Sequence, residues 1–327
     1  MPGIFEALPG IEAPVGSISK GLAQMWEGNA SQGKAAPGGE NAKAIQVNFV
    51  LHLGFNTDAT DAVRQFETAV RFSRRYPSRV VVLCPLHDDA GVTEMRAKVY
   101  GECSLGKTPG DTRCCEFVML SYPKWARANL EDQVSVCLST DIPLYYWAHR
   151  FSEAAKLADY RYLLTTAKRV LIDSATAPAD AIGYAWPKPE NVRDLAFARL
   201  LPVRQSIGQF LSRYPVESLS SGLTSVRLAH GAEVAAEARV LLGWVKDRID
   251  ASGAKGESAT VEASGALAPR AFDLSFAYGG KKAFSWRADT ASAHATFDAD
   301  FGSGRTVMPA IASLLAQENA LSEAMFF

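Results

Sequence analysis

Short apolar runs alternate with helix-like segments over the first half of the chain, and this alternation constrains the fold most. The runs Ile45–His52 and Arg79–Cys84 are nearly continuous in apolar character and rich in β-branched residues. Such runs are typical of strands that are buried on both faces of a sheet. Between them, Thr60–Arg75 has apolar residues at helical spacing, and Pro77 ends the helix. The alternation predicts a layered α/β domain with a mainly parallel central sheet.

The rest of this half continues the pattern. Further strands are predicted at Glu94–Tyr100, Arg113–Ser121, Ile142–Trp147 and Arg169–Asp173, and further helices at Ala126–Val136 and Ser152–Tyr160. The preceding residues 1–43 are rich in Gly, Ala, Pro and Ser and read as a flexible or partly helical segment. Helical spacing of Ile18, Leu22, Met25 and Trp26 predicts a short helix there, either packed on its own domain or serving as a partner-binding arm.

The second half of the chain has a different pattern, with longer helical segments and strands of alternating polarity. Helices are predicted at Asn191–Arg213, where Pro202 should kink or split the helix, and at Glu233–Asp250. Strict alternation in residues 272–278 and 284–286, around Gly279-Gly280, predicts an antiparallel hairpin. Strands at Thr224–Ala229 and Ala293–Phe297 and a final helix at Val307–Leu321 complete the list. We therefore predict an α/β domain over 44–175 and an α+β domain with an antiparallel sheet over 176–327.

Composition excludes several function classes. The chain of 327 residues has 34 Lys+Arg and 35 Asp+Glu, so no whole-chain field attracts nucleic acid or an anionic membrane. No apolar run approaches the roughly 20 residues of a membrane helix, and the first residues lack the features of a signal peptide. Five cysteines argue against a disulfide framework. We predict a cytoplasmic protein without nucleic-acid or membrane partners.

One motif matches a phosphate-binding loop. Gly101–Thr108 fits the pattern G-x-x-x-x-G-K-[ST] after a predicted strand. In such loops the Lys and Thr must open a helix whose amides hold the phosphates. Here Pro109-Gly110 follows, and a proline pushes the residue before it out of the helical region. A connection between two strands is therefore the favoured interpretation, and no cofactor is predicted.

The cysteines offer a second candidate chemistry. Cys114 and Cys115 are neighbours on a predicted strand, so their side chains point to opposite faces. Cys103 could face this strand, and the three together are candidate redox-responsive thiols; the alternative is a structural role. No His or second Cys pair stands at zinc-finger spacing, so no metal site is predicted.

Two loops carry further candidates. His87-Asp88-Asp89 follows a strand at the sheet end where α/β proteins place their sites, and His with Asp suits acid–base or metal chemistry. Gly302–Thr306 precedes the predicted last helix, so backbone amides and Arg305 could bind an anion there. A solvated loop and a capped loop, respectively, are the competing interpretations.

The stretch Asp141–Tyr214 contains no complete catalytic constellation, so no catalytic residue is predicted. It does contain Trp147, Arg199 and Arg204. Aromatic and arginine side chains are the usual anchors of protein interfaces, so we predict a partner-binding role for these three. Ion pairs between the arginines and acidic neighbours are the structural alternative.

This stretch and its flanks resemble the glucose-6-phosphate dehydrogenase assembly protein family, OpcA. The resemblance covers roughly Gln46 to the C-terminus. It is carried by the following segments: Tyr76–Val80, Cys114–Glu116, Asp141–Trp147, Asp173-Ser174, Asp194-Leu195, Arg199-Leu200, Pro202–Arg204, and Leu241–Trp244 before Arg248. The chain departs from the family pattern at Val203, where an aromatic is expected, and at Tyr146, where a second Trp is expected.

The resemblance implies a non-catalytic partner that promotes assembly or activation of glucose-6-phosphate dehydrogenase, at the entry to the oxidative pentose phosphate pathway. It also implies an α/β N-terminal domain and an α+β C-terminal domain. The competing hypothesis is an enzyme or sensor that binds a nucleotide or sugar phosphate, against which Pro109 argues.

Overall fold

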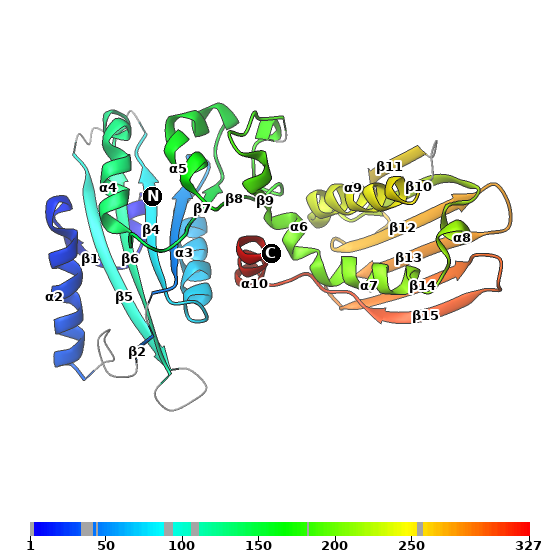
Figure 1. Ribbon diagram of the computed structural model, residues 1–327, viewed down its shortest axis with the longest axis horizontal. Coiled ribbons are helices and arrows are strands. Elements are labelled where there is room, and N and C mark those ends of the chain that lie inside the picture. The colour runs from blue at the N-terminus through cyan, green and yellow to red at the C-terminus, as the bar shows by residue number, and fades with distance from the viewer. Residues whose placement is uncertain are drawn as a thin grey trace. The chain divides into compact units, whose positions relative to one another are not determined.

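The computed structural model describes residues 3–33, 42–43, 45–87, 94–105, 111–181, 183–253 and 258–327 (Figure 1). The chain divides into two compact units. Unit 1 comprises Met1–Leu195 together with Leu321–Phe327, and unit 2 comprises Ala196–Ala320. The sequence analysis placed the boundary at 175/176 and did not assign the last residues to the first domain.

The described part of unit 1 contains a nine-stranded sheet in the order β1-β5-β6-β4-β3-β7-β8-β9, with β2 paired to β6. Strands β6, β4, β3, β7, β8 and β9 run parallel; β5 pairs antiparallel with β6, and β1 pairs antiparallel with β5. The strands are β1 (Ile11–Ala13), β2 (Ala42–Lys43), β3 (Val47–Leu53), β4 (Ser78–Pro85), β5 (Arg96–Leu105), β6 (Thr112–Tyr122), β7 (Leu144–His149), β8 (Arg169–Ile172) and β9 (Val192–Asp194). The predicted α/β class with a mainly parallel sheet is confirmed.

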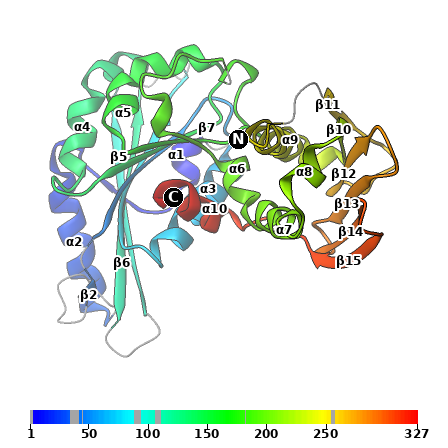
Figure 2. The same cartoon turned by 45° about the vertical axis from the view of Figure 1, so that its right-hand side comes forward.

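Helices cover both faces of this sheet, as Figure 2 shows. One face packs on α2 (Ile18–Ser31), α4 (Leu130–Cys137), α5 (Arg161–Thr166) and the 3₁₀ segments η2 (Lys124–Asn129) and η3 (Ala154–Tyr160). The other face carries α1 (Ile4–Ala7), α3 (Ala59–Ser73) and the end of α10 (Gln317–Phe326). Shorter 3₁₀ segments are η1 (Val15–Ser17), η4 (Ala179–Ala181) and η5 (Pro189–Asn191). Strands β3 and β4 are buried along almost their whole length because both faces are covered.

The N-terminal helix α2 packs on its own unit. Its four apolar residues at helical spacing, Ile18, Leu22, Met25 and Trp26, are all buried. Met25 and Trp26 lie so close to Gly101 on β5 that a Cβ there would come within 2.5 Å of either side chain. This apolar face is therefore used inside unit 1, as in the first of the two predicted alternatives.

Unit 2 has two layers. Its six described strands follow the order β11-β10-β12-β13-β14-β15, and α7 and α9 cover one face (Figure 1). The strands are β10 (Leu223–His230), β11 (Ser258–Ala263), β12 (Ala271–Tyr278), β13 (Ala283–Asp289), β14 (His294–Asp300) and β15 (Thr306–Ile311). The helical segments are α6 (Leu195–Arg199), α7 (Leu201–Leu211), α8 (Val216–Ser220), η6 (Ala232–Val234) and α9 (Ala235–Ala251). The predicted hairpin is β12–β13, with Phe276 opposite Phe284.

Two details of the second half concern proline. The predicted long helix is split at Leu200 into α6 and α7, and Pro202 lies in the first turn of α7, where its missing N–H costs nothing. The predicted last helix at Val307–Leu321 was wrong in its first half. Thr306–Ile311 pairs with β14 as an edge strand, which tolerates Pro309, and α10 begins only at Gln317.

A buried carboxylate anchors the start of α3. Asp58 caps the helix by accepting from the Asp61 backbone N–H at 2.7 Å. The Asp61 side chain contacts His149 Nε2 at 2.6 Å, Gln65 Nε2 at 2.8 Å and Arg150 Nε at 2.9 Å. Burial by itself raises the pKa of the Asp61 carboxyl, but hydrogen bonds from His149, Arg64 and Gln65 together outweigh it and hold the pKa well below its usual range.

We expect Asp61→Asn to destabilise the protein by about 3 kcal/mol at pH 7, because it removes the charge that several buried donors contact. The depressed pKa means that the carboxylate stabilises the fold above the unfolded-state pKa of about 4, and that this contribution is lost as pH falls through the native pKa. The gap between wild type and variant should therefore shrink at pH 3. Urea denaturation at both pH values measures it.

Asp58→Asn is the matched control, because asparagine caps a helix about as well as aspartate. Equal stability of the Asp61 and Asp58 variants at pH 7 would contradict the anchoring role.

Candidate functional site at the carboxyl edge of the parallel sheet

The parallel sheet has a topological switch point at β3. The chain continues from β3 to β4 on one side, and β7 later pairs with β3 on the other side. In open α/β sheets, ligands bind beyond the carboxyl ends of the strands at such a point. The candidate site is therefore the edge formed by the ends of β3, β4, β6 and β7.

A chain of buried polar side chains fills the interior of this edge. His52, near the end of β3, has Nδ1 2.9 Å from the Tyr146 hydroxyl and Nε2 2.9 Å from the Tyr122 hydroxyl. The Tyr122 hydroxyl lies 3.0 Å from that of Tyr160. Burial, assisted by the positive charge of Arg127, lowers the pKa of His52 to about 3, so the imidazole is neutral at pH 7. One ring nitrogen thus donates to a tyrosine and the other accepts from one.

The tyrosines of this chain stay protonated. Burial raises the pKa of Tyr122, Tyr146 and Tyr160 above the ordinary phenol value. None of these hydroxyls supplies a charge at neutral pH. The chain is therefore a satisfied hydrogen-bond network that connects strands β3, β6 and β7 to η3, rather than a set of activated acids and bases.

Little space remains beyond this network. The cavity at the edge measures only about 10 Å³, roughly the room for one water molecule. Its walls include Gly54, Phe55, Arg127, Phe151, Lys156 and Tyr160. Gly54 is required because a Cβ would lie 2.5 Å from the Arg150 carbonyl oxygen. At the neighbouring start of α3, where a phosphate would bind in a nucleotide site, Asp58 and Asp61 already occupy the helix N-terminus.

The outer rim of the edge is aromatic and basic. Trp125 on η2 is 61% exposed, and Arg127 two residues later lies 5.6 Å from the centre of the Phe55 ring. The His87 ring also packs against the Phe55 ring, and the two ring centroids are 4.7 Å apart. Lys156 completes the rim. We call Phe55, His87, Trp125 and Lys156 the carboxyl-edge surface; Arg127 is not counted in it, because its side chain is largely buried and paired with Asp159 at 2.8 Å.

Most of this surface was not predicted from the sequence. His87 was a candidate, whereas Phe55, Trp125 and Lys156 were not. A signal was present, because Pro123 ends a strongly apolar strand and Trp125 follows it directly. A large aromatic residue immediately beyond a buried strand lies at the sheet edge, where half of its neighbours are solvent.

Two of the three predicted partner-binding residues are not on a surface. Trp147 is completely buried in the middle of β7, where its ring stacks on Phe49. Arg199 forms an ion pair with Glu237, in which both side chains are largely buried. Neither side chain is exposed as an interface anchor would be, so the structure does not favour a partner contact through Trp147 or Arg199.

The remaining basic candidates lie in unit 2. Arg204 stacks on the ring of Phe197 at 3.6 Å, and Phe197 is 38% exposed. Arg305 forms a bidentate pair with Asp298, with distances of 2.8 and 2.7 Å. Since β15 rather than a helix follows Arg305, the helix N-terminus on which the predicted anion site depended is not there.

Two sequence motifs extend beyond the described residues. In the phosphate-loop pattern, Gly101–Leu105 belongs to β5 and pairs antiparallel with β6, which agrees with a connection between strands. Lys107 and Thr108 lie outside the described residues, as do Asp88 and Asp89. In the parts of the chain that the structure describes, no group of three or more His, Cys, Asp or Glu could hold a metal ion, and no helix is long and apolar enough to cross a membrane.

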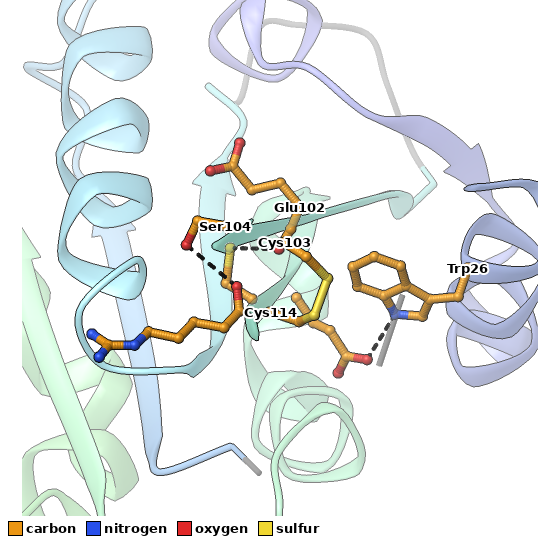
Figure 3. The surroundings of a disulfide bond; sticks show 8 residues. Trp26, Glu102, Cys103, Ser104 and Cys114 are labelled. Atoms are coloured by element: carbon orange, nitrogen blue, oxygen red, sulfur yellow. Dashed lines mark hydrogen bonds between the residues drawn. A yellow bond between two sulfur atoms is a disulfide. The ribbon is translucent and has the colours of Figure 1, made fainter. Parts of the chain in front are cut away.

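The cysteine count argued against a disulfide framework, and the described residues contain one disulfide. Cys103 and Cys114 face each other across β5 and β6, with Cα atoms 4.0 Å apart, and form a disulfide (Figure 3). Trp26 lies beside the bond and donates to Glu116 at 3.0 Å. Cys115 points the other way, and burial raises the pKa of its thiol to about 12. Such a protonated thiol is a poor nucleophile.

We expect the double variant Cys103→Ser/Cys114→Ser to be about 2–3 kcal/mol less stable than the oxidised protein, because the bond restricts a short loop of the unfolded chain. Chemical denaturation with and without reductant measures the difference, and mass spectrometry reports the state of the thiols. Wild type in reductant should behave like the variant. If complete reduction left wild-type stability unchanged, the bond would have no structural role.

One protein-family model matches part of the chain. Residues 69–201 match the family model described as the glucose-6-phosphate dehydrogenase subunit N-terminal domain. A search of curated proteins found no match.

Solved structures with a similar arrangement are distant. Aldose-aldose oxidoreductase from Caulobacter crescentus has 12% identity and a TM-score of 0.40, covering 84% of this chain and 87% of that chain. KijD10, a 3-ketoreductase from Actinomadura kijaniata in complex with NADP, has 9% identity and a TM-score of 0.40, covering 85% and 87%. At this distance neither structure informs the function. The match over residues 69–201 agrees with the sequence resemblance to the glucose-6-phosphate dehydrogenase assembly protein family.

Proposed function

We propose that the protein is a non-catalytic cytoplasmic assembly factor that binds glucose-6-phosphate dehydrogenase and promotes its active oligomer. The match of residues 69–201 to the subunit family carries this proposal. An activator of this kind must bind the active oligomer more tightly than the inactive state, because a ligand shifts an equilibrium only by its differential affinity.

The contents of the carboxyl edge favour binding over catalysis. His52 is neutral and has both ring nitrogens engaged, and the cavity above it has room for about one water. The carboxylates of Asp58 and Asp61 would repel a phosphate at the start of α3. An enzyme or sensor for a nucleotide or sugar phosphate would need this edge to open and these groups to move.

The carboxyl-edge surface is the contact that we propose for the dehydrogenase. Trp125, on η2, is 61% exposed, whereas Arg127 two residues later is largely buried and paired with Asp159 at 2.8 Å. Tryptophan is among the residues most enriched in interface hot spots, so Trp125 is the anchor of the proposed contact. The rigid sheet behind it reduces the entropy lost on binding. The exposed Phe197 of unit 2, whose ring stacks on the half-buried Arg204, is a second candidate contact.

Mixing the purified protein with its cognate dehydrogenase should raise dehydrogenase activity and shift the sedimentation of the enzyme to a larger species. We expect Trp125→Ala to weaken this binding at least about tenfold, as at a typical hot spot. Arg204→Ala should weaken it less. Val136→Ala is the matched control, because Val136 is exposed on α4 and belongs to neither set of candidate contact residues.

Unchanged activity and sedimentation would refute the assembly function. If Trp125→Ala bound as tightly as Val136→Ala, the function would stand and the carboxyl-edge surface would be the wrong contact.

The competing function has its own measurement. ATP, NADP and glucose 6-phosphate should each leave the melting temperature of the isolated protein unchanged at millimolar concentration. A ligand that binds the native state at a hundred times its Kd would stabilise it by about 2.7 kcal/mol, which a thermal shift detects readily. A large shift with one of the three alone would favour the enzyme or sensor.

A further inference from the structure

Unit 2 contains a pocket that the proposed function does not use. It has a volume of about 470 Å³, within the range of small-molecule sites of about 300–1,000 Å³. It lies between α7, α8 and α9 over the inner face of the sheet. Its walls are mainly apolar and include Ile207, Leu211, Leu219, Trp244, Ile249 and Phe276. Most of its surface would therefore favour an apolar ligand.

A glycine keeps one wall of this pocket open. Gly208 lines the pocket from within α7, and a Cβ placed on it would meet no atom within 4 Å. Glycine destabilises a helix interior relative to alanine, so this position carries a cost in stability. The structure therefore has room for a Cβ at this position without a clash.

One charged side chain lines the pocket. Arg248 lies in the last turn of α9 and is exposed, and within the described residues it forms no ion pair. The serines at the rim are already engaged, since Ser212, Ser220 and Ser252 each donate to a helix carbonyl. Besides the Tyr214 hydroxyl and the Trp244 indole N–H, the guanidinium is the charged group that can orient a ligand, and its fork geometry suits a carboxylate.

We propose that this pocket binds a small amphipathic carboxylate, with the apolar body among the three helices and the carboxylate paired to Arg248. The volume admits a medium-length alkyl chain or a fused aromatic body. The apolar walls supply most of the affinity, and Arg248 discriminates an acid from the neutral alcohol of the same length. The site does not depend on the dehydrogenase, so it can be tested on the isolated full-length protein.

The test is equilibrium dialysis of the protein against labelled decanoate and labelled decanol. Wild type should bind decanoate more tightly than decanol. Gly208→Phe should abolish binding of both, because its ring occupies the pocket. Arg248→Gln should weaken decanoate binding about tenfold and leave decanol unaffected, which removes the preference.

Two controls match these variants. Gly243→Phe adds the same bulk to α9 at a glycine that also faces open space but does not line the pocket, and Lys246→Gln removes a charge from the same helix. Both should bind as wild type does. Melting temperatures confirm that every variant is folded, and Gly208→Ala provides a smaller filling variant with improved helix propensity.

Three results would overturn the proposal. They are no binding of either ligand by wild type, undiminished binding by Gly208→Phe, and a retained preference for decanoate in Arg248→Gln. If Gly208→Phe instead impaired capture of the dehydrogenase while wild type bound no carboxylate, the pocket would be a partner contact and the small-molecule assignment would be wrong.

Discussion

Burial of the parallel strands on both faces is the constraint on which unit 1 depends. It removes water from most polar side chains on β3, β6 and β7, so a partner inside the protein stabilises such a group. His52 on β3 pairs with two tyrosines, and His149 on β7 pairs through Nε2 with Asp61 of α3, which also contacts Arg150 and Gln65. The two networks close the carboxyl ends of the strands from within. The same burial that stabilises the sheet thus fills the place where related architectures hold a ligand.

The sequence identified most strands of unit 1 because a doubly covered strand is apolar at consecutive positions. Coverage of both faces is also the reason why the aromatic residues of these strands were wrongly expected at the surface. Tyr145, Tyr146 and Trp147 alternate between two covered faces, so none of them reaches solvent, however suitable their rings are for an interface. Trp125 reaches solvent because the strand before it has ended. Whether an aromatic residue reaches solvent therefore depended on its position relative to the end of the strand, and not on how many aromatic residues the segment contains.

Contacts between residues far apart in the sequence also could not be predicted from local periodicity. Arg199 and Glu237 lie on different helices, and only the packing of α6 near α9 brings them within 2.7 Å. Cys103 and Cys114 lie on two strands that were both predicted, but their bond depends on the register, which local patterns left open. At Thr306–Ile311 the edge of the sheet determined the conformation, because pairing with β14 outweighed the helical spacing of the apolar residues.

Two glycines differ in the space around them, one in each unit. At Gly54 a side chain would collide with the Arg150 carbonyl, so the glycine permits close packing at an edge that is already full. At Gly208 a side chain would meet nothing, so the glycine leaves a pocket open. The pocket beside Gly208 therefore has room for a small ligand, whereas the sheet edge beside Gly54 can contact a partner only through the side chains on its outer rim. Docking through Trp125 and ligand binding beside Arg248 therefore rest on separate residues in separate units. Any influence of one on the other would be a coupling free energy, which the affinities of the single and combined variants would measure directly.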